Sequence, residues 1–205
     1  MPDVDYTNTA QTDLAIIQTL AADLTAISSE FTPAGKLAAR LHITHAKDHA
    51  SVPVLAGTKY TVEVSMQATG NDSWCPVWSC QAGVTLPVAM VTDGTEAVGQ
   101  TVIECGAALP VVGDVVCFKH ATIGSTEFKE VVARVVTGGS ETVTLKSALT
   151  NEQAQGTYYT QVEMWQPVFD LQGVLRLRVV INNNLGTTNR AIIFRVKLVS
   201  CDGIG

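Results

Sequence analysis

Charged residues are scarce in this chain, and it has no long apolar run. Asp, Glu, Lys and Arg make up only 16% of the 205 residues, against 46% hydrophobic residues. This balance excludes wholesale disorder and allows a substantial core. No apolar run approaches the ~20 residues of a membrane span. The N-terminus is polar and acidic, unlike a secretory signal peptide, so we expect a protein made and assembled in a cytoplasm.

Catalytic motifs are also absent. The chain has no Gly-x-Ser-x-Gly elbow, no P-loop and no dinucleotide-binding fingerprint. Three of its four histidines lie close together, at His42, His45 and His49, which invites a metal-site interpretation. On a strand, however, His42 and His45 point to opposite faces, and the metalloprotease helix motif is missing. We therefore predict no catalytic residues, no metal site and no cofactor.

The five cysteines, an odd number, do not form a recognisable framework. Cys75 and Cys80 are close enough in sequence to form a disulfide or hold a metal, but no second Cys or His pair lies at zinc-site spacing. In a reducing compartment, free thiols that pack as small apolar groups are the simpler interpretation for all five.

The clearest pattern in the sequence is its last apolar stretch, Val174 to Ser200. Side chains in a strand alternate between faces, so two apolar faces can be read there: Leu175, Leu177, Val179 and Ile181, then Ile192, Phe194, Val196 and Leu198. Asparagines, a glycine and threonines between the two runs supply turn chemistry. The stretch predicts a long β-hairpin with one apolar side, which other strands must cover.

Earlier segments supply these covering strands. Alternating patterns at 37–43 and 59–66 predict two strands that pair with the hairpin, and seven prolines and sixteen glycines suit β structure. Between these two strands and the C-terminal stretch, five short strands separated by turns are predicted. They are Gln100–Glu104, Val115–Lys119, Glu127–Val136, Thr142–Leu145 and Thr157–Val162. We expect a β-sandwich body from residues 36–90 plus 160–205, with residues 91–159 inserted as a small β-barrel.

Residues 1–35 are predicted to form an N-terminal arm and helix, which completes a mainly β fold. From Thr9 or Thr12 to about Ser29, apolar residues recur at helical spacing, including Leu14, Ile17 and Leu24. Thr32-Pro33-Ala34-Gly35 ends the helix. Two interpretations stay open: the helix packs on its own sheet, or it is an arm that docks on a neighbouring subunit through these residues.

The polar side of the predicted hairpin is basic. It carries Arg176 and Arg178 on one strand and Arg195 and Lys197 on the other. With a turn near 185–187, Arg176 would face Lys197 and Arg178 would face Arg195, which is unfavourable unless acids lie nearby. Glu63 is one in-chain candidate. The face is either solvated or binds an acidic partner, such as the acidic arm or insertion of another copy.

Charge is distributed unevenly enough along the chain to support binding of the basic side of the hairpin to an acidic partner. Residues 1–35 carry five acids and no base, and residues 91–159 carry eight acids and four bases, whereas the remainder carries six acids and nine bases. The net charge of −6 argues against a nucleic-acid sleeve, and no aromatic residue interleaves with the four cations of the hairpin to stack on bases.

Trp74 and Trp78 form an aromatic and cysteine-rich patch after the Gly70-Asn71-Asp72 turn. Tryptophans can line a sugar-binding surface, and they can equally anchor a core or an interface. The sequence allows both interpretations.

The insertion resembles a known class of module. Its pattern is a Gly113-Asp114 turn entering a strand, a second strand with Glu127, Val131 and Val135, then Thr142-Val143-Thr144-Leu145, Leu149 and Gly156. This is similar to small β-barrel modules common in virion proteins of tailed bacteriophages, and the match covers about a quarter of the chain. The motif is structural in that family, so it assigns no functional residue.

The resemblance implies a non-enzymatic virion structural protein. We expect a capsid decoration or cement subunit that binds copies of itself and the major capsid or tail proteins, without membrane contact. A neck or tail component is the first alternative, and a carbohydrate-binding module of a receptor-binding appendage is the second.

Overall fold

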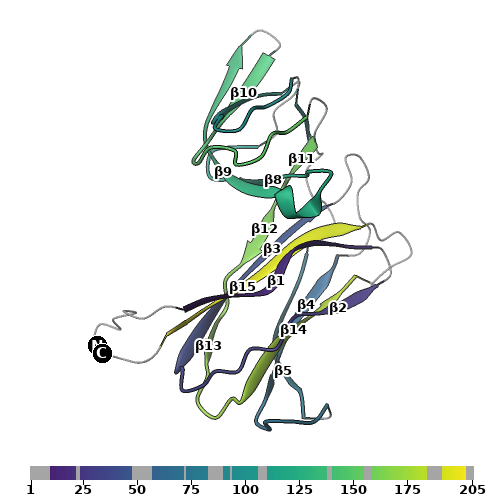
Figure 1. The fold of residues 1–205 in the computed structure, drawn as a ribbon, viewed down its shortest axis with the longest axis vertical. Helices are drawn as coiled ribbons and strands as arrows, with labels where there is room; N and C mark the ends of the chain where they lie inside the picture. The colour runs from purple at the N-terminus through teal and green to yellow at the C-terminus, as the bar shows by residue number, and fades with distance from the viewer. Residues whose placement is uncertain are drawn as a thin grey trace.

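The protein is mainly β, with its strands arranged in three antiparallel sheets. The computed structural model describes residues 10–21, 24–47, 57–71, 73–82, 90–92, 94–105, 110–137, 140–154, 158–183 and 191–201. In this part of the chain, no helix is long and apolar enough to cross a membrane. Two modules stack end to end along the long axis of the molecule (Figure 1).

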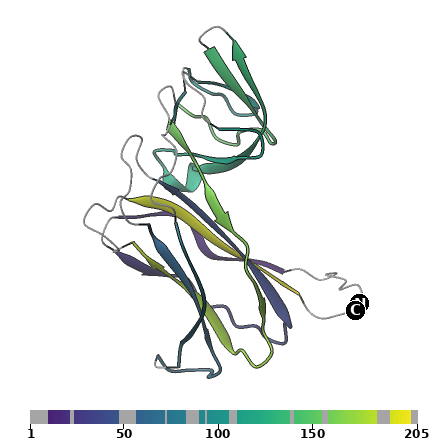
Figure 2. The same ribbon diagram turned by 180° about the vertical axis from the view of Figure 1, so that it is seen from behind.

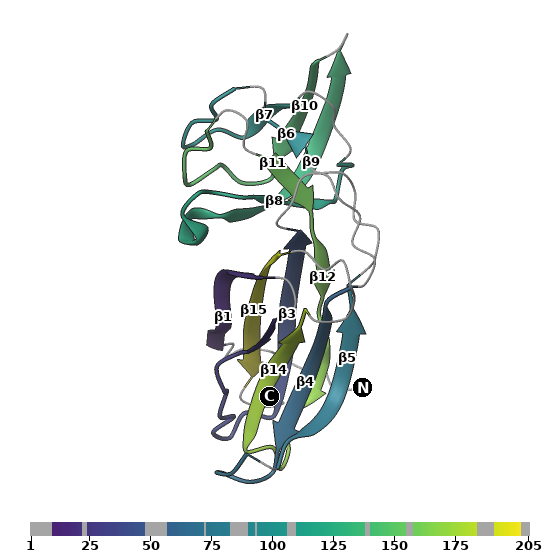
Figure 3. The same cartoon turned by 90° about the vertical axis from the view of Figure 1, so that its right-hand side faces the viewer.

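The lower module in Figure 1 is a two-layer β-sandwich, and Figure 3 shows strands of one layer side by side, facing the viewer. Sheet A has the order β1-β15-β3-β12, with β13 also pairing with β3, and sheet B has the order β2-β14-β4-β5. Sheet A contains β1 (Ala10–Leu20), β3 (Ala38–Lys47), β12 (Glu163–Trp165), β13 (Val168–Asp170) and β15 (Ile192–Cys201). Sheet B contains β2 (Thr25–Ile27), β4 (Lys59–Ser65), β5 (Cys75–Gln81) and β14 (Arg176–Asn182).

The core of the sandwich lies between these two sheets. Residues that alternate along each strand point inward, and they form one continuous buried cluster. Its central members are Leu41, Ile43, Tyr60, Val62, Leu177, Val179, Ile181, Phe194, Val196 and Leu198. The strands predicted at 37–43 and 59–66 are confirmed as β3 and β4, and they pair with β15 and β14 as expected.

The predicted C-terminal hairpin is wrong. β14 and β15 do not pair with each other: β14 lies between β2 and β4 in sheet B, whereas β15 lies between β1 and β3 in sheet A. Each strand has one apolar side. This pattern fits two strands that are neighbours in one sheet, and it fits equally two strands that face each other from different sheets. The fold places the two strands opposite each other across the core, so the chain crosses between sheets after Asn182.

The predicted N-terminal helix is also wrong, because the described part of that segment forms β1 and β2. β1 runs antiparallel along β15 with two register irregularities, between Asp13 and Ala15 and between Ala15 and Gln18. Irregularities of this kind break the period-two alternation of a strand. Leu14 and Ala15 are consequently both buried although they are adjacent. The resulting spacing of apolar residues imitates that of a helix.

The upper module is a six-stranded antiparallel sheet with the order β6-β11-β8-β9-β10-β7. Its strands are β6 (Met90–Val91), β7 (Val102–Cys105), β8 (Val115–Phe118), β9 (Glu127–Thr137), β10 (Ser140–Leu145) and β11 (Tyr158–Gln161). The five strands predicted in this region are confirmed, with bounds that shift by a few residues. The sheet has its own core of Ile103, Val116, Phe118, Val131, Val143, Leu145 and Leu149.

A third apolar cluster joins the two modules. It contains Ala46 of β3, Cys117 of β8, Ile193 of β15 and Val162. The chain passes through this junction from β11 into β12 (Figures 1 and 2), and the amide of Val162 donates to the carbonyl of Val115 at 2.8 Å. The 3-10 turn η1 (Ile123–Ser125) contributes Ile123 to the edge of the cluster.

A buried ion pair organises one loop of the upper module. The Lys129 ammonium lies 2.7 Å from the Glu127 carboxylate, and both side chains are buried. Burial alone would raise the pKa of Glu127. Hydrogen bonds from Lys129, Thr150 and Asn151 outweigh burial and lower this pKa to about 2. Glu127 thereby fixes the loop after β10.

We expect Leu177→Ala to destabilise the sandwich far more than Leu175→Ala. Leu177 is 0% exposed in the core, whereas Leu175, two residues earlier, is 44% exposed. Emptying the Leu177 site should lower the free energy of unfolding by about 2–5 kcal/mol, against less than about 1 kcal/mol at Leu175. Guanidinium unfolding of the two variants measures this difference. Equal losses would contradict the placement of the core.

Protonation of Glu127 should weaken the upper module in acid. Because the folded pKa is below the ordinary value of 4.5, this contribution is complete above pH ~4.5 and is lost as the pH falls towards ~2. The loss should be on the order of 2–3 kcal/mol. Glu127→Gln should be less stable at neutral pH and should lack this component. Unfolding curves of both proteins across this range test it, and parallel pH profiles would contradict it.

Candidate interaction surfaces

The four cations predicted to form one stripe lie on two opposite outer faces of the sandwich. Arg176 and Arg178 belong to β14 in sheet B, whereas Arg195 and Lys197 belong to β15 in sheet A. The predicted pairing of Arg176 with Lys197 is therefore wrong. In the observed register Arg178 is opposite Glu63, and Lys197 is opposite His42 on one side and Asp13 on the other.

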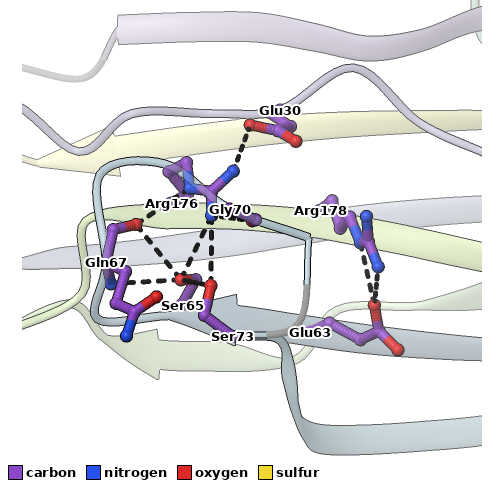
Figure 4. Close-up of polar contacts among 8 residues, drawn as sticks. All are labelled: Glu30, Glu63, Ser65, Gln67, Gly70, Ser73, Arg176 and Arg178. Carbon is purple, nitrogen blue, oxygen red and sulfur yellow. Dashed lines mark hydrogen bonds and ion pairs between the residues drawn. The ribbon is translucent and has the colours of Figure 1, made fainter.

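Arg176 is the centre of a buried hydrogen-bond network (Figure 4). Its guanidinium donates from Nε to the carbonyl of Gln67 at 2.9 Å and from Nη2 to the carbonyl of Gly70 at 2.7 Å. Nη2 also reaches the hydroxyls of Ser65 and Ser73 at 3.4 and 3.2 Å. Nη1 pairs with Glu30 at 3.2 Å. The side chain thus ties β14 to the β4–β5 loop and to the segment after β2.

Trp74 extends this network. The guanidinium carbons of Arg176 and Arg178 lie 4.5 and 4.1 Å from the centre of its ring, within the range of cation–π attraction. Arg178 also donates to Glu63 at 2.8 Å, which confirms Glu63 as an in-chain partner. With two guanidinium groups over its ring, Trp74 does not present an open stacking platform for a sugar.

Trp78 and the apolar residues of the N-terminal segment have different surroundings. Trp78 is half-buried and packs against the sandwich core. Leu14 is part of that core, whereas Leu24 is half-exposed between β1 and β2. Ile17 lies in β1, and its side chain is outside the described residues. The structure therefore does not bring Leu14 and Leu24 together on one exposed docking stripe.

Arg195 is neutralised on sheet A by Asp13 of β1. Its Nε and Nη2 donate to Asp13 Oδ1 at 3.0 and 2.8 Å, and Nη2 also reaches Oδ2 at 3.1 Å. This forked contact joins two strands that are far apart in sequence. The sandwich arginines Arg176, Arg178 and Arg195 are thus each paired with an acid of the same chain, as Arg134 of the upper module is with Glu141.

Other cations on sheet A are not neutralised in this way. Arg40 is exposed on β3, and neither it nor Lys197 has an ion-pair partner among the described residues. His42 lies between them. Burial, followed by the positive charges of Arg40 and Lys197, lowers the pKa of His42. Arg40 was not singled out by the sequence, although its alternation with Ala39 and Leu41 already placed it on the outer face.

The histidines and cysteines do not converge on a metal site in the described part of the chain. His42 points outward, whereas His45 points inward and contacts the hydroxyl of Tyr60 through Nδ1 at 2.9 Å. His49 is outside the described residues. Cys75, Cys80 and the buried Cys117 are thiols that form no disulfide, and the side chains of Cys105 and Cys201 are not described. Burial and the nearby Glu163 raise the pKa of Cys80 to about 12, so this thiol stays protonated at neutral pH.

Comparison with known proteins adds no relative: no family model matches the chain, and no curated protein matches it.

Replacing Arg176 should cost much more stability than replacing Arg195. Arg176→Ala removes the buried guanidinium that donates to the carbonyls of Gln67 and Gly70 and to the buried hydroxyl of Ser65, so we expect a loss of about 2–3 kcal/mol. The pair of Arg195 with Asp13 is about one-third exposed, and Arg195→Ala should cost at most about 1 kcal/mol.

Arg176→Lys refines this test. Lysine keeps the charge but lacks the fork of donors that reaches several acceptors, so it should recover only a small part of the loss. Chemical denaturation of the three variants measures these differences. Full recovery by lysine would contradict the role of the hydrogen-bond geometry.

Proposed function

We propose that this chain is a non-enzymatic structural protein of a tailed bacteriophage virion, acting as a capsid decoration or stabilising subunit. We interpret the upper module as the small β-barrel of that class. In this proposal the protein works through multivalent contacts with copies of itself and with the major capsid or tail proteins. It is assembled into particles in the host cytoplasm.

The observation that carries the proposal is the fit between the virion-module pattern and the upper module. Gly113 has φ +96° and occupies the turn that enters β8. The Asp114 carboxylate in that turn accepts from the amide of Val111 at 2.9 Å. Val131 and Leu145 are buried on paired strands, and Leu149 completes the same core. These residues of the pattern thus occupy turn and core positions of one module, whereas Val135 is about half-exposed and Gly156 lies outside the described residues.

The two alternatives differ in their support. A neck or tail position uses the same module and the same kind of contacts, so it remains the runner-up. The carbohydrate-binding alternative depended on Trp74 and Trp78. The guanidinium groups over Trp74 and the packing of Trp78 against the core weigh against that use of the two rings.

Particle composition tests the proposal. Gradient-purified particles of the phage that carries the gene should contain the chain in many copies, measured by quantitative mass spectrometry. A decoration subunit should be released by mild denaturant before the shell dissociates. A low, fixed copy number would support the neck or tail alternative instead, and absence of the chain from purified particles would contradict a virion role.

A further inference from the structure

One face of the sandwich combines unneutralised cations with exposed apolar side chains. On the outer face of sheet A, Arg40 of β3 is directly opposite Val168 of β13, and Lys197 is directly opposite His42. Val168 is about half-exposed, as is Met164, which pairs with Thr44 on the same face. We call this set, Arg40, His42, Met164, Val168 and Lys197, the basic face.

Two acids lie near the basic face, Asp13 and Asp170, and neither forms an ion pair with Arg40 or Lys197 among the described residues. The Asp13 carboxylate receives the fork of Arg195. The Asp170 carboxylate accepts from the amide of Gln172 at 2.9 Å. Like charges on neighbouring strands destabilise a sheet. The chain nevertheless leaves Arg40 and Lys197 around His42, while it pairs four other arginines internally. This arrangement favours an external anionic partner.

The upper module has an exposed sheet face that combines apolar side chains with an acid. In the register of β9, β10 and β7, Val135, Thr142 and Glu104 form one cross-strand row, and Ala133, Thr144 and Val102 form the next. These side chains point away from the core, since Ile103 and Val143 point into it. Val102 and Val135 are about half-exposed, and Glu104 is exposed. We call Val102, Glu104, Ala133, Val135, Thr142 and Thr144 the acidic face.

The two faces complement each other in charge and in apolar character. Glu104 supplies the negative charge of the acidic face itself, and it lies in a segment, residues 91–159, that carries eight acids against four bases. Of the described acids there, Glu127 and Glu130 are paired with Lys129 and Lys146, whereas Glu104 has no ion-pair partner among the described residues. Both faces are exposed within one chain, so they can cover each other only between copies.

We propose that the basic face of one copy binds the acidic face of a second copy. The contact joins different surfaces of the two molecules, so it is heterologous and builds a ring or an open row. Arg40 and Lys197 would meet Glu104, and Val168 and Met164 would pack on Val102 and Val135. This inference rests on the proposed structural function and specifies which surfaces make its self-contacts.

Charge reversal and restoration test the contact. Light scattering and sedimentation velocity on the purified full chain should detect oligomers that loosen as salt is added. Arg40→Glu and Glu104→Arg should each weaken association at least about tenfold, because like charges then meet. The double variant Arg40→Glu with Glu104→Arg should restore much of the association, since the pair is re-formed with its signs exchanged.

Matched controls come from exposed charges elsewhere. Lys59→Glu changes an exposed lysine on sheet B, and Glu152→Arg changes an exposed acid outside the β9–β10–β7 rows. Both should leave association unchanged, and circular dichroism should show that every variant is folded. A wild-type chain that is monomeric at all concentrations, or a double variant no better than the single ones, would overturn the proposal.

The experiments distinguish failure of the proposed contact from failure of the proposed virion role. If the chain is abundant in purified particles but is monomeric in solution, and if the two single variants enter particles as well as wild type, the contact is wrong and the virion role stands. If the chain is absent from particles yet shows the charge-swap behaviour, the contact stands and the virion role is wrong.

Discussion

Burial of the apolar sides of β14 and β15 against each other, from two different sheets, is the constraint on which the rest of the fold depends. Leu177 and Val179 face the core from one layer, and Phe194 and Val196 face it from the other. Each strand then needs its own partners, which β4 and β2 supply in sheet B and β3 and β1 supply in sheet A. The N-terminal segment must therefore cross between the layers as well.

The end of β14 is fixed by polar contacts of Asn183. The Asn183 side chain is buried and donates to the carbonyl of Ala21 at 2.9 Å, while its oxygen accepts from the hydroxyl of Thr58 at 2.8 Å. Buried polar groups that satisfy each other in this way hold a chain in one geometry. They join the end of β14 to the segments that follow β1 and precede β4.

The placement of β14 and β15 in different sheets also determines the surroundings of the four cations. A hairpin would have placed all four on one face, where they would repel each other. With the strands in separate sheets, Arg176 becomes an internal brace of sheet B, and Arg195 clamps the edge strand β1 through Asp13. Among the described cations of sheet A, Arg40 and Lys197 remain without an ion-pair partner. In this account the basic surface of the molecule is smaller than the sequence suggests, and it lies elsewhere.

Much of this architecture is predictable from the sequence, and the errors have physical causes. Strands β3 and β4 alternate regularly, so the local pattern finds them, whereas β8 to β10 are marked by the glycine-containing turns around them, since three consecutive residues of β8 are buried. Alternation in β14 and β15 reveals their apolar sides. It cannot distinguish two strands hydrogen-bonded in one sheet from two strands that face each other across the core. In β1, two irregularities replace the period of two by a helix-like spacing. The Arg176 network depends on backbone carbonyls of Gln67 and Gly70, which no residue pattern reveals.

The division of the two C-terminal strands is tested most directly by cross-strand proton contacts measured by NMR on the labelled chain. The account predicts contacts between the backbone protons of Arg178 and Glu63 and between those of Lys197 and His42, as the register requires. Backbone contacts between Arg176 and Lys197 would instead place the two strands in one hairpin. That result would contradict the sandwich, the internal role of the arginines and the location of the basic face.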